Sequence, residues 1–94
     1  MKFTEQNVKY RPLIGLRVTI IDCTDPSLIG ATGLILEDRD RSLVILRTDT
    51  SPRRKITVMK AYGCKFSIET CDGSFVVKGE EILGRPSSRI KRWL

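Results

Sequence analysis

The chain contains no histidine, and aromatic residues make up only 6% of it. Without histidine, no side chain has an unperturbed pKa suited to proton transfer near neutral pH. The sequence also lacks the Gly-x-Ser-x-Gly, Walker and His-Glu-x-x-His patterns that place catalytic groups at fixed spacings. We therefore expect no catalytic residues here. If the chain serves an enzyme, another component performs the chemistry.

Cysteines are few, and none are spaced as Cys-x-x-Cys. The three are Cys23, Cys64 and Cys71. A structural zinc site needs four Cys or His ligands, usually in close pairs, so this chain does not make one alone. The odd count, without a signal peptide, predicts reduced and semi-buried thiols.

A divalent-metal site is the other inorganic possibility. The acids that could collect such an ion are Asp22, Asp25, Glu37, Asp38 and Asp40. Signs alternate from Asp38 to Arg41, however, which is typical of a solvated, self-compensating turn, and loop acids without other ligands are weak evidence. We expect no metal and no cofactor bound by this chain.

Long apolar runs are absent as well. No stretch approaches the roughly 18 apolar residues of a membrane span, and the first residues do not resemble a secretory signal. With 94 residues there is room for one hydrophobic core, so we expect a single cytoplasmic domain over 1–94.

The apolar pattern has a period of two, which predicts strands. We expect six, near 16–22, 32–37, 42–48, 54–60, 64–69 and 74–78. Asp72-Gly73 between two alternating runs is the clearest hairpin signal, and Gly30 and Gly33 suit a sharply bent second strand. Short strands at this spacing favour a mostly β fold, a small six-stranded antiparallel barrel of the Sm-like or SH3-like kind, because closure removes exposed edges.

The two ends of the chain are predicted to be helical or extended rather than β. Thr4 can cap a turn over residues 5–10, and Pro86 suits the first turn of a last helix. In that helix Ile90, Trp93 and Leu94 share a side by helical spacing, which predicts that the arginines point outward. We therefore divide the domain into an N-terminal segment 1–15, a barrel 16–79 and a basic tail 80–94.

Charge is concentrated in two blocks. The chain has 17 Lys and Arg against 11 acids, a net charge of +6. No acid occurs between residues 50 and 68, and residues 82–94 hold four cations and no acid. Concentrated positive charge binds polyanions, because each neutralised phosphate releases condensed counterions. The alternative is a pair of solvated basic segments without a partner.

Several segments then resemble a known family. They are Leu13-Ile14-Gly15-Leu16, the stretch 26–33 with its Gly-x-x-Gly, Glu37, Gly79, and the ending Gly84-Arg85-Pro86 with Arg89. In this order the chain resembles the Sm-like barrel subunit family of archaeal ribonuclease P, protein component 1. Any single segment also occurs elsewhere, whereas the combination with Gly-Arg-Pro-x-x-Arg is much more specific.

The resemblance implies a six-stranded barrel with helical ends. It also implies a non-catalytic subunit of a ribonucleoprotein endonuclease whose RNA, with magnesium ions, removes the 5′ leader of precursor tRNA. The implied partners are ribonuclease P RNA and a zinc-ribbon protein subunit, with precursor tRNA contacted indirectly and no membrane. The chain would then be a monomer or one half of a heterodimer.

The candidate contact residues follow from charge and position. Arginine matches phosphate geometry with a planar fork of donors, and aromatic side chains in turns can stack on bases. Leu13, Ile14 and Leu16 either cap the barrel, which a core this small favours, or meet a protein partner. The RNA-binding candidates are Arg53, Arg54, Lys55, Lys60, Tyr62, Lys65, Arg85, Arg89, Lys91 and Arg92.

Two other functions remain open from the residues alone. One is a ribosomal or translation-associated barrel that binds structured RNA in another particle. The other is an Sm-like protein that forms homo-oligomeric rings through its edge strands, which so basic a chain resists in the absence of RNA.

Overall fold

The computed structural model describes the backbone of residues 2–60 and 63–93, and their side chains as far as residue 90. Six antiparallel strands form one sheet, and all six predicted strands are present with bounds within one residue of the prediction. They are β1 (Arg17–Asp22), β2 (Thr32–Asp38), β3 (Ser42–Arg47), β4 (Arg54–Met59), β5 (Lys65–Thr70) and β6 (Gly73–Lys78). The mostly β fold class is confirmed.

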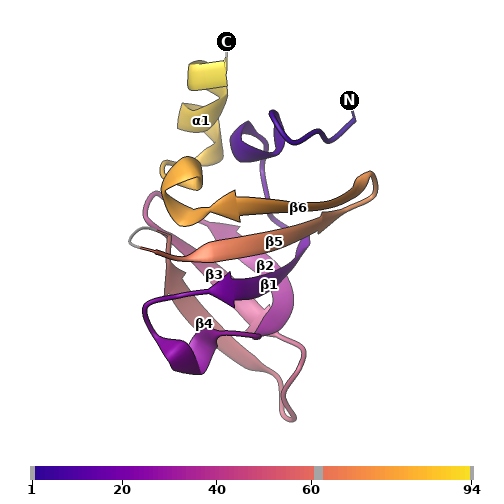
Figure 1. Ribbon diagram of the computed structural model, residues 1–94, viewed down its shortest axis with the longest axis vertical. Coiled ribbons are helices and arrows are strands. Elements are labelled where there is room, and N and C mark those ends of the chain that lie inside the picture. The colour runs from indigo at the N-terminus through magenta and orange to yellow at the C-terminus, as the bar shows by residue number, and fades with distance from the viewer. Residues whose placement is uncertain (1, 61–62, 94) are drawn as a thin grey trace.

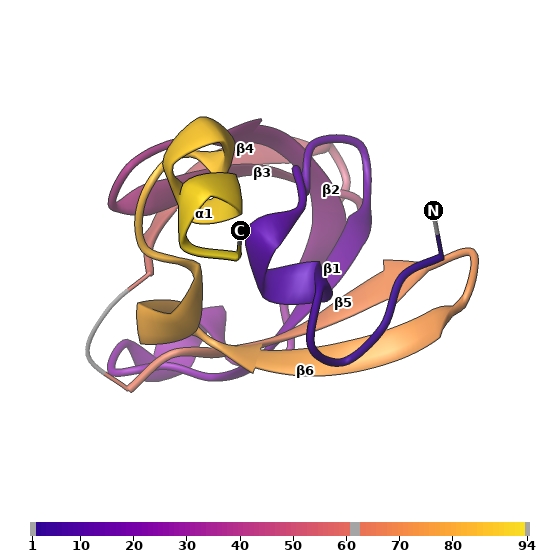
Figure 2. The same cartoon turned by 90° about the horizontal axis from the view of Figure 1, so that it is seen from above.

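The sheet has the order β4-β3-β2-β1-β5-β6 and curls around its core (Figure 1; Figure 2). Its two edges approach each other just after β4 and β6. A methyl group added at Gly79 would overlap the carbonyl group of Lys60, and the Gly79 amide donates to the Cys64 carbonyl at 2.8 Å. Glycine is therefore required where the curled sheet comes closest to closing.

The second strand carries an irregularity that decides which side chains face inward. Ile35 pairs with Ile45, but Glu37 pairs with Val44, so β2 has one extra residue at this point. Ile35 is buried, Leu36 and Glu37 are exposed, and Asp38 is buried again. Such a bulge resets the alternation of a strand and re-aims the side chains beyond it. It turns Asp38 toward the interior.

Glycine is also needed within β2. A Cβ added at Gly33 would overlap the backbone of Leu46 on the neighbouring strand, which agrees with the predicted close approach in a bent strand. The predicted hairpin joins β5 to β6, although its two-residue turn is Cys71-Asp72, since Thr70 pairs with Gly73.

Short helices flank the sheet: η1 (Val8–Tyr10), η2 (Pro26–Leu28), η3 (Gly79–Ile82) and α1 (Pro86–Trp93). Thr4 and Asn7 close the first turn reciprocally, each backbone amide donating to the other side chain at 2.8 and 3.1 Å. The predicted N-terminal helix is therefore a shorter 3-10 turn. Pro86 begins α1 as expected, and α1 lies beside η1 over one end of the curled sheet (Figure 2).

The orientation of α1 differs from the prediction. Arg89 is completely buried, whereas Ile90 is 39% exposed. The prediction placed apolar side chains inward and arginines outward, but the end of the barrel offers carbonyl oxygens and a carboxylate rather than an apolar surface. The predicted inward side chains of Trp93 and Leu94 lie outside the described residues.

The curled sheet encloses one hydrophobic core. Its completely buried members include Leu13, Phe66, Ile68 and Ile82. Among the described residues, no helix has the length and apolarity needed to span a lipid bilayer.

Candidate nucleic-acid interface

Asp38, Lys60 and Arg89 form a buried ionic cluster, the Asp38 cluster, between the sheet and α1. The Arg89 guanidinium donates to both carboxylate oxygens of Asp38, at 2.9 Å to Oδ1 and 2.6 Å to Oδ2. The Lys60 ammonium donates to Oδ1 at 2.8 Å. All three side chains are fully shielded from solvent. A bidentate arginine–carboxylate pair of this kind is both strong and directional.

Backbone carbonyls complete the cluster. Lys60 Nζ also donates to the carbonyls of Arg39 and Gly84, at 2.5 and 3.1 Å. Arg89 donates to four carbonyls, those of Lys9 (2.8 Å), Arg11 (2.9 Å), Ile82 (3.3 Å) and Gly84 (2.6 Å). One side chain therefore joins the N-terminal segment, β2 and the η3–α1 connection.

Lys60 and Arg89 were predicted to contact RNA, and that prediction is wrong. Both charges are used internally, so neither is available to a phosphate group at the surface. Burial lowers the pKa of Lys60, an effect that the hydrogen bond to Asp38 opposes. The interpretation of Asp38 as part of a solvated turn is wrong too, because the bulge in β2 turns it inward.

One of these residues could have been found from the sequence. Lys60 continues the alternation Ile56, Val58, Lys60, which assigns it to the inward face of β4. Arg89 and Asp38 have no comparable signal in the sequence. The apolar pattern predicts neither the bulge that turns Asp38 inward nor the cluster of carbonyls that surrounds Arg89.

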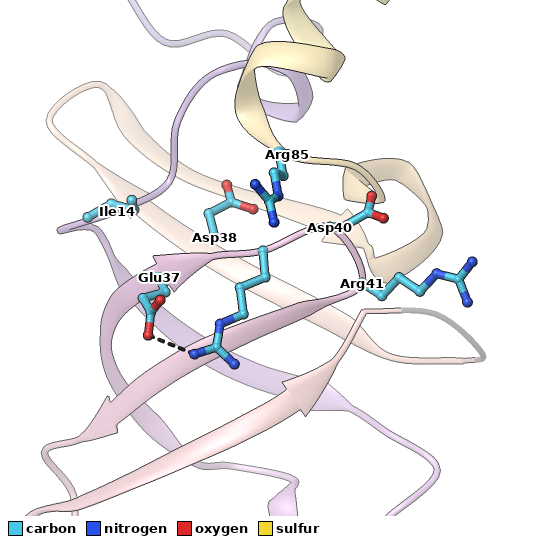
Figure 3. A pocket seen from close by; sticks show the side chains of 7 residues that line it. Ile14, Glu37, Asp38, Asp40, Arg41 and Arg85 are labelled. Atoms are coloured by element: carbon cyan, nitrogen blue, oxygen red, sulfur yellow. Dashed lines mark hydrogen bonds and ion pairs between the residues drawn. The ribbon is translucent and has the colours of Figure 1, made fainter.

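A pocket of about 510 Å³ opens next to the Asp38 cluster (Figure 3). It lies between the β2–β3 turn, the start of α1 and the segment before β1. In Figure 3, Asp38 points toward the start of α1 and Glu37 points to the other side, where it pairs with Arg39 at 3.0 Å. The lining residues are Ile14, Glu37, Asp38, Arg39, Asp40, Arg41 and Arg85.

Two cations of this pocket remain available. Arg41 and Arg85 are exposed and enter no ion pair among the described residues, whereas Arg39 is neutralised by Glu37. The predicted exposure of Arg85 is confirmed, although its contact with RNA stays a prediction. Tyr62 lies outside the described residues, as do the side chains of Lys91 and Arg92.

The second predicted basic block lies elsewhere. Arg53, Arg54 and Lys55 are exposed on the β3–β4 hairpin and form no ion pair within the described part of the chain. Figure 1 shows this hairpin at the end of the molecule opposite α1, and the longest dimension is 40 Å. The cations of this hairpin and the start of the basic tail therefore lie toward opposite ends of the molecule. Lys65, at the start of β5, is also exposed.

The three apolar candidates for a protein contact differ in how far the structure exposes them to solvent. Leu13 is completely buried in the core, so it caps the barrel and is not available to a partner. Leu16 is half-buried and packs against the same core. Ile14 is 57% exposed and lines the pocket, so it is the most exposed of the three.

Comparison with known proteins gives the family. A sequence model described as "Ribonuclease P/MRP, subunit p29" matches residues 6–92. The chain belongs to this family. It is 37% identical to "Ribonuclease P protein component 1" of Staphylothermus marinus over 91 residues, covering 97% of this chain and 96% of that protein. It is 39% identical to the protein of that name from Hyperthermus butylicus over 93 residues, covering 98% and 80%.

In this p29-family chain the Gly-Arg-Pro-x-x-Arg ending is divided between interior and surface. Gly84 has φ +94°, its amide donates to the Asp40 carbonyl at 2.7 Å, and its carbonyl accepts from Lys60 and Arg89. Arg85 points to the pocket, while Arg89 is internal. The motif thus fixes the tail on the barrel and presents one cation outward.

No metal-binding cluster is seen in the described part of this p29-family chain. Residues 2–60 and 63–93 contain no group of three or more Cys, Asp or Glu side chains placed to hold a metal ion.

Proposed function

We propose that this ribonuclease P subunit binds the catalytic RNA and supports removal of the 5′ leader from precursor tRNA without contributing catalytic groups. The observation that carries the proposal is the set of exposed cations without ion-pair partners in the described structure. They include Arg41 and Arg85 beside the pocket, and Arg53, Arg54 and Lys55 on the β3–β4 hairpin.

Electrostatics explains why these residues suit RNA. A cation held by a carboxylate must lose that partner before it can neutralise a phosphate, and these five have no such partner to lose. Arg17, Arg39 and Arg47, by contrast, already pair with acids. Each phosphate contact contributes to the salt dependence of binding, so four to six contacts predict a slope of log affinity against log salt of about −3 to −5.

The experiment compares binding to ribonuclease P RNA with binding to a structured RNA of equal length, across a salt series. We expect a preference for ribonuclease P RNA that persists as salt rises. Arg54→Glu and Arg85→Glu should each weaken binding and reduce the slope by about 1. Lys2→Glu, at an exposed cation outside both basic blocks, is the charge-matched control.

Two results would contradict the proposal. Equal binding to both RNAs would leave only a generic basic barrel, and binding that does not respond to salt would remove the electrostatic argument. Because Arg54 and Arg85 are exposed, their thermal transitions should match that of the unmodified chain, so weaker binding cannot be ascribed to unfolding.

We further propose that Ile14, on the side of the pocket formed by the segment before β1, meets the zinc-ribbon protein subunit, and that magnesium ions belong to the RNA-catalysed reaction. An exposed Ile14 beside a pocket is the feature that supports a protein contact there. Light scattering of the mixed subunits tests it: a one-to-one heterodimer that Ile14→Asp disrupts is expected. A ring mass for this chain alone would favour self-assembly instead.

A further inference from the structure

Two of the three cysteine thiols are in direct contact. Cys23 follows β1 and Cys64 precedes β5, two strands that pair with each other. The last paired residues are Asp22 and Lys65, so the cysteines occupy the next position of the same antiparallel ladder. Their Sγ atoms are 2.8 Å apart. Both thiols are free, and Cys71 lies apart from them on the β5–β6 turn.

The thiol pair is also reachable from solvent. Cys23 and Cys64 line a cavity of about 340 Å³ together with side chains from the β1–η2 connection and from β4. Cys23 is half-buried, whereas Cys64 is only 2% exposed. A small disulfide reagent in this cavity meets Cys23 first, and Cys64 is already in place behind it.

We propose that Cys23 and Cys64 are a redox-active dithiol that closes to an intramolecular disulfide linking β1 to β5. The oxidant is a low-molecular-weight disulfide. The Cys23 thiolate attacks one sulfur of the reagent, forming a mixed disulfide and releasing one thiolate. The Cys64 thiolate then attacks Cys23 Sγ, closing the protein disulfide and releasing the second thiolate. Two protein thiols are oxidised, one reagent disulfide is reduced, and the two thiol protons pass to solvent or to the released thiolates.

The pKa of Cys64 indicates which step limits the rate. Burial, with the hydrogen bond to Cys23, raises the pKa of Cys64 to about 11. Since the thiolate is the attacking form, the second step should become faster as pH rises toward that value. A mixed disulfide at Cys23 should therefore accumulate transiently at neutral pH and disappear faster at alkaline pH.

The bond would constrain a large part of the fold. The two cysteines are 41 positions apart, and β2, β3 and β4 all lie in the loop that they close. Closing a loop of this length restricts the unfolded chain strongly, and native contacts already bring the sulfurs together. The oxidised protein should therefore have a higher Tm than the reduced protein, by about 10 °C or more.

The test incubates the folded full-length chain with glutathione disulfide, and in parallel with a phosphine reductant. Intact-mass measurement should show loss of two hydrogen atoms in the oxidised sample. Proteolysis without reduction should then yield one linked peptide pair containing Cys23 and Cys64. Cys71→Ser is the matched control and should close the same bond, with the same rise in Tm.

The single variants separate this inference from its alternatives. Cys23→Ser and Cys64→Ser should each take up glutathione at most and show no rise in Tm. If Cys23 and Cys64 both remain open to alkylation after oxidation of the folded protein, or if the bond formed involves Cys71, the proposal is wrong. None of these measurements involves RNA, so the result is independent of the proposed function.

Discussion

Replacing Arg89 by methionine should destabilise this protein as a core mutation does. The change removes two donors to Asp38 and leaves that carboxylate with Lys60 as its only charged partner among the described side chains. It also removes the donors to the carbonyls of Lys9 and Arg11. Breaking a buried ion pair from one side costs about 3–5 kcal/mol, which is a large part of the roughly 5–15 kcal/mol typical of a whole domain.

For a domain of this size, that cost corresponds to a fall in Tm of at least about 12 °C. Urea unfolding followed by circular dichroism gives the free energy directly. Arg85→Met is the matched control, because Arg85 lies next to the same helix but is exposed, and it should change the free energy of unfolding by no more than about 0.5 kcal/mol.

The order of effects within the cluster tests the reasoning further. Asp38→Asn should cost at least as much as Arg89→Met, because it leaves Lys60 and Arg89 buried side by side with no carboxylate between them. The variant that combines Asp38→Asn with Arg89→Met should lose clearly less free energy of unfolding than the sum of the two single losses, since both changes break the same interaction. If Arg89→Met behaves like Arg85→Met, the Asp38 cluster does not hold the fold together and the argument fails.

Two further predictions concern the ends of the chain. The Lys9 ammonium lies 2.6 Å from the Glu81 carboxylate and holds the pKa of Glu81 below its ordinary value of 4.5. The stabilisation from this ion pair is therefore complete above pH 4.5 and is lost as the pH falls through the lower pKa of the folded state. Glu81→Gln should thus flatten the acid side of a Tm-against-pH profile, and an unchanged profile would count against the pair. Gly79→Ala should cost about 1–3 kcal/mol in urea unfolding, because the added methyl overlaps the Lys60 carbonyl, whereas the neighbouring Lys78→Ala should be nearly neutral.

The sequence predicted the strands well because alternation is a local signal. Leu16 to Ile20 alternates over its own length, and no distant residue is needed to interpret it. The prediction of exposed cations was correct for Arg53, which follows Pro52 in the β3–β4 loop, and for Arg54, which begins β4. Loop cations reach solvent whatever the rest of the fold does.

The Asp38 cluster could not be predicted in the same way. Its acid is turned inward by a bulge, and a bulge depends on how two strands pair rather than on either strand alone. The position of Arg89 depends on carbonyls from separate segments that meet only in the folded chain. The sequence shows how many cations the tail contains, but it does not show that one of them, Arg89, is internal.

The cluster also has a consequence for the order in which the chain is made. Asp38 and Lys60 leave the ribosome first, and Arg89 follows 51 positions after Asp38. Every strand of the barrel precedes Arg89 in the chain, so all six are synthesised before the guanidinium that the buried carboxylate requires. Synthesis thus supplies the core's strongest ionic partner last, and the N-terminal segment, whose carbonyls need the same side chain, cannot dock fully until then.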